Sequence, residues 1–139
     1  MIRLLFLGLL LTSCYREKLS VFTEYISFRT LPSYIMGTPD PRLYCPDFGE
    51  KLHITWSLSK KCNYETLSLH IDLRYGDGTF DSQDVELFTP TGIYVLPLLN
   101  EDYRSKGGIF TYKITLYGDG EPIQVERHLL WMDPIDLED

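Results

Sequence analysis

Apolar and polar residues alternate with a period of two along three stretches of the chain, 51–58, 67–75 and 110–116. Successive side chains of a β-strand point to opposite faces, so this period is typical of strands with one buried face. The residues predicted to point inward are Leu52, Ile54, Trp56 and Leu58; Leu67, Leu69, Ile71, Leu73 and Tyr75; and Phe110, Tyr112, Ile114 and Leu116. These three strands are expected to supply most of the core.

Further strands are predicted where the alternation is shorter. Val85 with Leu87, and Ile93 with Val95, indicate two short strands on either side of 89–92. Pro97 has no N–H to donate, so the second of these strands is expected to lie at a sheet edge or to end there. A last strand is predicted over 123–132. The residues of this strand predicted to point inward are Ile123, Val125, Leu129 and Trp131. Arg127 falls on the same face, so a bulge is expected near it.

Residues 15–44 give the weakest pattern. The stretch 20–28 is rich in β-branched and aromatic residues, which favours a strand, although Leu19, Phe22 and Ile26 also fit one helical face. The prolines and glycine of 32–41 interrupt regular structure, and 38–41 is interpreted as a turn before the main domain. No helix is predicted after Tyr44. Six or seven short strands predict an all-β antiparallel sandwich, and a closed barrel is the alternative.

The first thirteen residues have the pattern of a signal peptide. Arg3 precedes an apolar run from Leu4 to Leu11, which is shorter than the roughly 20 residues that a membrane-spanning helix needs. The segment 11–14, Leu-Thr-Ser-Cys, resembles the lipobox of bacterial lipoproteins, in which the cysteine is acylated and becomes the first mature residue. An ordinary signal peptide that ends near a cysteine is the alternative.

The lipobox resemblance implies that Cys14 carries lipid and that the domain is anchored to a membrane of the cell envelope, outside the cytoplasm. Tyr15, where inner-membrane lipoproteins of enteric bacteria have Asp, favours the outer membrane. The expected organisation is a signal peptide over 1–13, a lipid-anchored tether or first strand region over 14–40, the sandwich over 41–133 and an acidic tail over 134–139.

A second resemblance covers the predicted sandwich. The segment 73–78, Leu-Arg-Tyr-Gly-Asp-Gly, resembles the Trp-x-Phe-Gly-Asp-Gly turn of PKD domains, which are immunoglobulin-like sandwiches on extracellular proteins. Tyr103 and the stretch 108–116 are similar to the Tyr…Gly-x-Tyr-x-Val-x-Leu-x-Val of that family, and Gly49 matches its opening strand. The chain departs from the family at Leu73, which replaces Trp, and in a longer interval from Gly78 to Tyr103, where an extra hairpin is expected. The resemblance implies adhesion, spacing or binding, but fold alone does not give function.

Charge narrows the range of partners. The formal net charge is −7 and the sequence has no basic stripe, so a nucleic-acid partner is not expected. The membrane contact is expected to come from acyl chains rather than from cationic attraction to lipid headgroups.

The two remaining cysteines, Cys45 and Cys62, form an even pair in an oxidising compartment. They flank the predicted strand 51–58, which rises about 3.3 Å per residue, whereas bridged Cα atoms lie within about 7 Å. A disulfide would require the segment before that strand to double back along it. A bridge and two separate thiols both remain open.

No residue pattern predicts catalysis, a resident metal or a cofactor. An acidic loop, Asp77, Asp81, Asp84 and Glu86, lacks the spacing of an EF-hand and is expected to be solvated, although some PKD-like domains bind calcium. The histidines at 53, 70 and 128 are expected on strand surfaces without metal spacing, and Trp56 and Trp131 at core positions. The predicted function is a lipid-anchored protein-binding or scaffold module that contacts an envelope protein around 89–99. The alternative is an envelope enzyme or an accessory subunit of one.

Overall fold

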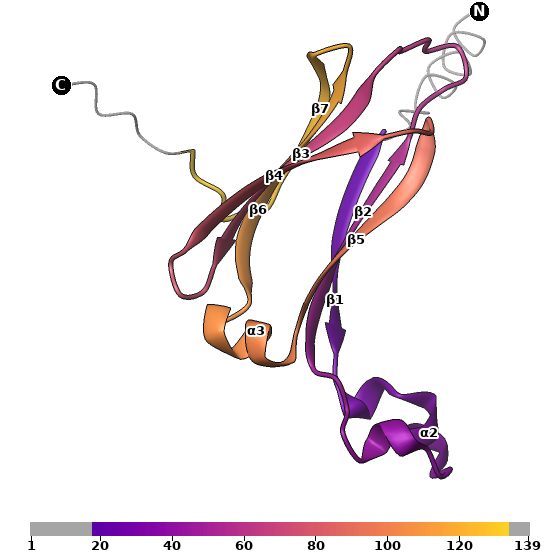
Figure 1. The fold of residues 1–139 in the computed structure, drawn as a ribbon, viewed down its shortest axis with the longest axis vertical. Coiled ribbons are helices and arrows are strands. Elements are labelled where there is room, and N and C mark those ends of the chain that lie inside the picture. Colours follow the sequence, from indigo (N-terminus) through magenta and orange to yellow (C-terminus); the bar gives the residue numbers. More distant parts are fainter. Residues whose placement is uncertain (1–17, 134–139) are drawn as a thin grey trace, which may run out of the picture.

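Two antiparallel sheets face each other across the core (Figure 1). Sheet A has the strand order β1 (Leu19–Ile26), β2 (Gly49–Ser57) and β5 (Thr91–Leu99). Sheet B has the order β4 (Phe80–Leu87), β3 (Leu67–Tyr75), β6 (Ile109–Gly118) and β7 (Glu121–Arg127). The structure, a computed structural model, describes residues 18–133. The predicted all-β antiparallel sandwich is confirmed.

Strand β1 extends the folded domain beyond its expected N-terminal boundary. It pairs with β2 from Leu19 opposite Trp56 to Ile26 opposite Gly49, and Leu19 is fully buried. The stretch 20–28 is therefore largely strand rather than helix, and the sandwich begins well before residue 41. The predicted leader, Cys14 and the tail over 134–139 lie outside the described residues.

Short helices occupy two connections. The β1–β2 connection contains η1 (Phe28–Thr30), α2 (Pro32–Met36) and η2 (Pro41–Leu43), and α3 (Asn100–Lys106) joins β5 to β6. Helix α3 corrects the expectation of no helix after Tyr44. It has acidic residues in its first turn and basic residues in its last, which complement the helix dipole, and it ends at Gly107 in the left-handed conformation. Within 18–133, no helix combines the length and apolarity needed to cross a membrane.

The core follows the two cleanest sequence patterns. The predicted inward residues of β2 and β3 form its centre, and only Leu67 among them is partly exposed. Trp56 is 6% exposed, and its Nε1 donates a hydrogen bond to the carbonyl oxygen of Thr89 at 3.0 Å. The indole thus fills the core and ties β2 to the connection between β4 and β5.

Two strands bury residues that the sequence pattern did not identify. In β5 the inward side chains are Tyr94 and Leu96, opposite Ile54 and Leu52 of β2. Both phases of β5 are apolar, so alternation cannot choose between them. In β6 the register shifts opposite Arg74 and Tyr75, and this irregularity leaves Phe110 exposed and Thr111 buried.

The C-terminal strand is shorter than the predicted 123–132. Strand β7 ends at Arg127, and its register shift lies where Tyr117 pairs with Pro122 rather than at Arg127. Beyond the strand, Leu129 is almost fully exposed. The Trp131 ring lies on the outside, 5.0 Å from the Arg74 guanidinium carbon. The predicted core position of Trp131 is therefore wrong, because the strand ends before it.

The interval from Gly78 to Tyr103 does not contain the expected extra hairpin. Strand β4 lies at the edge of sheet B and β5 at the edge of sheet A, and the residues Phe88 to Pro90 between them cross from one sheet to the other.

The Gly-Asp-Gly turn between β3 and β4 packs against the end of α3. The N–H of Gly76 donates to the carbonyl of Gly108, and the N–H of Asp77 donates to that of Lys106, each at 2.9 Å. A Cβ on Gly76 would lie 2.3 Å from the carbonyl oxygen of Gly107, whereas Gly78, at φ +87°, has open space around it. Gly76 therefore permits a close approach, and Gly78 supplies a left-handed turn residue.

We expect Gly76→Ala to lower the free energy of unfolding by about 2–3 kcal/mol, because two backbones must move apart. Gly78→Ala is the matched control and should cost about 1 kcal/mol, the penalty for an L-residue at positive φ. Denaturant titration of the two variants measures the difference. Equal losses would show that close packing against α3 is not what requires Gly76.

Candidate functional site

The outer face of sheet A carries an apolar surface that runs across all three strands. Phe22 of β1, His53 of β2 and Val95 of β5 are direct neighbours in register, and Ile93 lies in the adjacent row. The Phe22 ring stacks on the His53 imidazole at 4.6 Å with an interplanar angle of 2°. Ile93 is 65% exposed and Val95 39% exposed. These four residues form the sheet A surface.

The same surface reaches an open sheet edge. On the β1 side, the Gln124 side chain from β7 accepts from the Lys18 N–H at 3.0 Å and donates to the Leu19 carbonyl at 3.2 Å, which occupies the backbone groups at the start of that edge. Strand β5 forms the other edge and has β2 as its neighbour. The expectation that 89–99 contains an edge strand is confirmed. Because an edge strand has backbone groups that its own sheet does not pair, β5 can accept an added strand.

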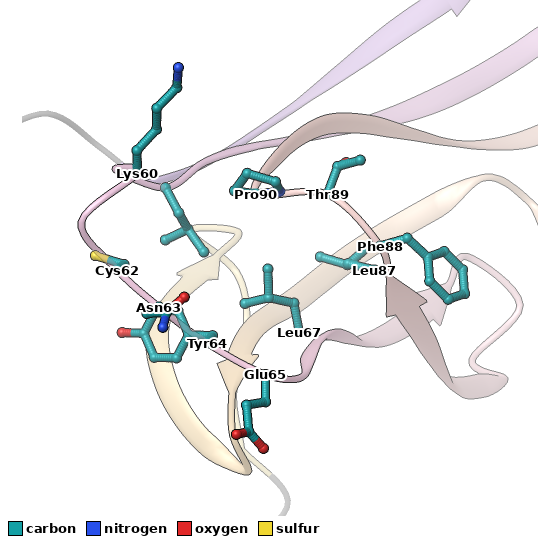
Figure 2. A pocket seen from close by; sticks show the side chains of 11 residues that line it. Lys60, Cys62, Asn63, Tyr64, Glu65, Leu67, Leu87, Phe88, Thr89 and Pro90 are labelled. Carbon is teal, nitrogen blue, oxygen red and sulfur yellow. The ribbon is translucent and has the colours of Figure 1, made fainter.

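A hollow of about 320 Å³ lies at one end of the sandwich, between the β2–β3 connection and the β4–β5 crossover. Figure 2 shows Leu67 and Leu87 pointing into it, whereas Lys60 and Phe88 point away. Cys62 also lines the hollow. The lining thus combines apolar side chains with polar ones, among them Asn63, Tyr64 and Glu65.

The outer face of sheet B brings together residues that the sequence did not connect. His70 pairs with Asp84 and Asp72 pairs with Ser82 across β3 and β4. The Nδ1 of His70 lies 2.6 Å from an Asp84 carboxylate oxygen, and its Nε2 lies 3.3 Å from the Ser82 hydroxyl. Ser82, His70 and Asp84 thus stand in the order of a hydrolytic triad. Their pairing across a hairpin follows only from the register of β3 and β4.

The hydroxyl of Ser82 is directed elsewhere. Its shorter contact, 2.8 Å, is to an Asp72 carboxylate oxygen, and Asp72 also lies 3.2 Å from Nε2 of His70. A hydroxyl has one proton to donate, and here the carboxylate accepts it in place of the imidazole. None of these residues lines the hollow at the end of the sandwich. This geometry favours a polar network on the surface. Ser82 would form a nucleophile–base pair only if its hydroxyl donated to His70 instead of to Asp72.

The acidic loop does not converge on one point. Asp77 accepts hydrogen bonds from the N–H and hydroxyl of Thr79, and these bonds lower the pKa of its carboxyl. Asp84 contacts Nδ1 of His70, and Asp81 lies 3.4 Å from the Tyr75 hydroxyl. Among residues 18–133, no three histidine, cysteine or acidic side chains are grouped so as to hold a metal ion.

The remaining predicted site residues lie apart. Cys45 and Cys62 are free thiols, and they flank opposite ends of the nine-residue strand β2. In the structure, Cys45 and Cys62 are two separate thiols and do not form a disulfide. His53 contacts Glu24 at 2.7 Å, and His128, beyond β7, packs its ring edge-on against Tyr112 at 5.4 Å. The three histidines therefore occupy separate places. His53 and His70 lie in strands as expected, whereas His128 lies beyond the end of β7.

Sequence reasoning also missed a buried carboxylate. Glu50 lies at the start of β2 with its side chain in the interior, and it accepts a hydrogen bond from the N–H of Ile109. The carboxylate thus provides a hydrogen-bond acceptor for the backbone N–H of Ile109, next to the register shift between β3 and β6. This is a structural role.

Comparison of the chain with protein-family models, curated proteins and solved structures found no match.

Proposed function

We propose that this protein is a lipid-anchored module of the cell envelope that binds another envelope protein through sheet A. The observation that carries the proposal is the sheet A surface, in which Phe22, Ile93 and Val95 are exposed apolar side chains beside the partly buried His53. This surface is continuous with the β5 edge. Exposed apolar side chains beside unpaired backbone groups are the features of strand addition and of packing against a sheet face.

The proposed anchor makes a modest interface effective. A lipid on Cys14 would confine the domain to a membrane, where a partner in the same membrane is present at high effective concentration. The lipobox-like segment 11–14 supports this anchor, and the residue after it, Tyr15, supports the outer membrane.

The proposed fold family is immunoglobulin-like and resembles PKD domains. The order β1-β2-β5 facing β4-β3-β6-β7 supports this assignment, since chains of this family cross repeatedly between two such sheets. The Gly76 and Gly78 turn at the end of β3 supports it also.

We expect acidic substitutions on the sheet A surface to break the partner contact without unfolding the domain. A photo-crosslinking residue at position 97, in the outward row of β5, should trap one envelope protein in intact cells, and Ile93→Glu or Val95→Glu should remove most of that product. Both side chains are substantially exposed, so the free energy of unfolding should change by under about 0.5 kcal/mol.

Val125→Glu is the matched control. Val125 lies in an edge strand of sheet B and is 37% exposed, close to the 39% of Val95, and its substitution should leave the cross-linked product unchanged. Equal loss with both valine variants, or no effect of the β5 variants, would contradict the assignment to sheet A.

A hydrolytic enzyme is the second candidate, because Ser82, His70 and Asp84 are in contact. If the surface network catalyses ester hydrolysis, purified protein should show a rate that Ser82→Ala abolishes and that a matched substitution of a distant hydroxyl, Ser33→Ala, retains. An unchanged background rate in all three proteins removes this candidate.

A further inference from the structure

A basic cluster lies at one end of sheet A. Lys18, Lys60 and Lys61 line one hollow of about 570 Å³, together with the hydroxyl residues Ser57, Ser59 and Thr91. Lys18 immediately precedes β1, whereas the other two follow β2. The antiparallel pairing that places Leu19 opposite Trp56 brings them together, and the N–H of Ser57 donates to the Lys18 carbonyl at 2.9 Å.

This cluster concentrates positive charge in an acidic protein. The formal net charge is −7, yet no carboxylate lines this hollow. Among residues 18–133, none forms a salt bridge with Lys18, Lys60 or Lys61. Figure 2 shows the Lys60 side chain extending outward from this end of the domain.

The acidic groups at the same end belong to the sheet B side. Asp119, in the turn between β6 and β7, accepts the N–H groups of Glu65 and Thr66, each at 2.9 Å. Glu65 lines the neighbouring hollow rather than the basic one. Lys60 also lines that neighbouring hollow, so positive and negative groups adjoin there, whereas Lys18 and Lys61 line the hollow that has no carboxylate. The sheet A side of this end therefore presents positive charge to an anionic surface.

We propose that Lys18, Lys60 and Lys61 dock this end of the domain on the anionic phosphate headgroups of the membrane that holds the Cys14 lipid. The inference rests on the proposed lipid anchor. Cys14 is four residues before Lys18, and four residues span at most about 14 Å. A lipid on Cys14 would therefore keep the basic cluster close to the headgroups. The attraction between the lysines and the phosphates acts over a Debye length of about 8 Å at physiological salt, which lies within the reach of this tether.

Docking at this end fixes the orientation of the whole sandwich. Strand β2 has nine residues and spans about 30 Å, with Cys62 beyond its membrane-facing end and Cys45 before its opposite end. The β5 edge then runs away from the bilayer and stays accessible to a partner. The sequence predicted membrane contact through acyl chains alone, because these lysines come together only when β1 pairs with β2.

The two native thiols, Cys45 and Cys62, allow the distance of each end of the domain from the bilayer to be measured. Full-length lipidated protein is placed in nanodiscs that contain an energy-transfer acceptor on the lipid headgroups. A donor dye is attached to Cys62 in the Cys45→Ser variant, or to Cys45 in the Cys62→Ser variant. On bilayers containing phosphatidylglycerol, transfer should be strong from Cys62 and weak from Cys45.

The triple variant Lys18→Gln, Lys60→Gln, Lys61→Gln should remove this difference. A lysine near an anionic surface contributes about a fivefold preference, so three lysines change the ratio of docked to undocked domains on the order of 100-fold. The matched control removes the same number of charges elsewhere, in Arg29→Gln, Lys51→Gln, Arg104→Gln, and should keep the difference. Neutral phosphatidylcholine bilayers, or 1 M salt (a screening length of about 3 Å), should abolish it in the unsubstituted protein.

The outcomes separate this inference from the proposed anchor. Equal transfer from both thiols in an acylated protein on anionic bilayers would overturn the docking and leave the anchor intact. A difference that survives the triple variant, or that is equally large on neutral bilayers, would show that the tether alone sets the orientation, and would also overturn the docking. Protein that carries no acyl chain and fails to float with the bilayers would refute both.

Discussion

Cys14→Ser is expected to abolish incorporation of fatty acid and to release the protein from the membrane fraction or leave its leader uncleaved. In the proposed anchor, the lipid would be held by a thioether at the Cys14 sulfur, and the serine hydroxyl is a much weaker nucleophile than a thiolate. Metabolic labelling with a palmitate analogue, followed by membrane fractionation, measures both effects. Each buried methylene contributes roughly 0.8 kcal/mol to membrane binding, so loss of the proposed acyl chains would remove most of the expected membrane affinity.

The other two cysteines provide internal controls for this experiment. Cys45 and Cys62 are free thiols in the folded domain, and Cys45→Ser and Cys62→Ser should label as strongly as the unsubstituted protein. Continued labelling of Cys14→Ser, or loss of label in either control, would mean that the lipid is attached elsewhere and would remove the basis for the lipobox assignment.

The sequence predicted the fold where one strand face is apolar and the other polar. Strands β2 and β3 satisfy this condition, and their inward residues, among them Ile54 and Ile71, are fully buried. Strand β5 does not, because Tyr94 and Leu96 on one face alternate with Ile93 and Val95 on the other. Only pairing with β2 selects which face is buried, and pairing is not encoded in a single strand.

Local irregularities escaped prediction for a related reason. A bulge changes the phase of alternation within one strand, so Phe110 fits the predicted inward series but lies outside. Helix α3 is short and has no buried residue, and a helix without an apolar face leaves no periodic signal. Its charged ends and Gly107 were the available signals.

The candidate sites were least predictable because they combine residues from different segments. Ser82 and His70 come within 3.3 Å only through strand pairing, although counting outward from the Gly76 turn would have placed them near each other. Lys18 and Lys60 are brought together by the β1–β2 register. The stretch 20–28, which is ambiguous as a sequence, had to be recognised as a strand before this cluster could be seen.

Trp56→Ala is expected to lower the free energy of unfolding by about 3–5 kcal/mol, the usual cost of truncating a buried aromatic residue. The indole is 6% exposed, and it lies beneath Gly92, where an added Cβ would come within 2.5 Å of the ring. Such close packing leaves the surrounding backbone little freedom to collapse into the vacated space. A domain of this size has about 5–15 kcal/mol of stability in total, so the variant should be at or near the limit of folding.

Two further variants separate the contributions to this loss. Trp56→Phe retains most of the ring but leaves the Thr89 carbonyl without the indole N–H, and should cost about 1–3 kcal/mol. Lys51→Ala changes the outward face of the same strand and should cost under about 0.5 kcal/mol. Denaturant titrations in which Trp56→Ala loses the most, Trp56→Phe less and Lys51→Ala the least would confirm that packing of the indole outweighs its hydrogen bond. Similar losses for Trp56→Ala and Lys51→Ala would mean that the two faces of β2 contribute alike, which is incompatible with a core on one side of the strand.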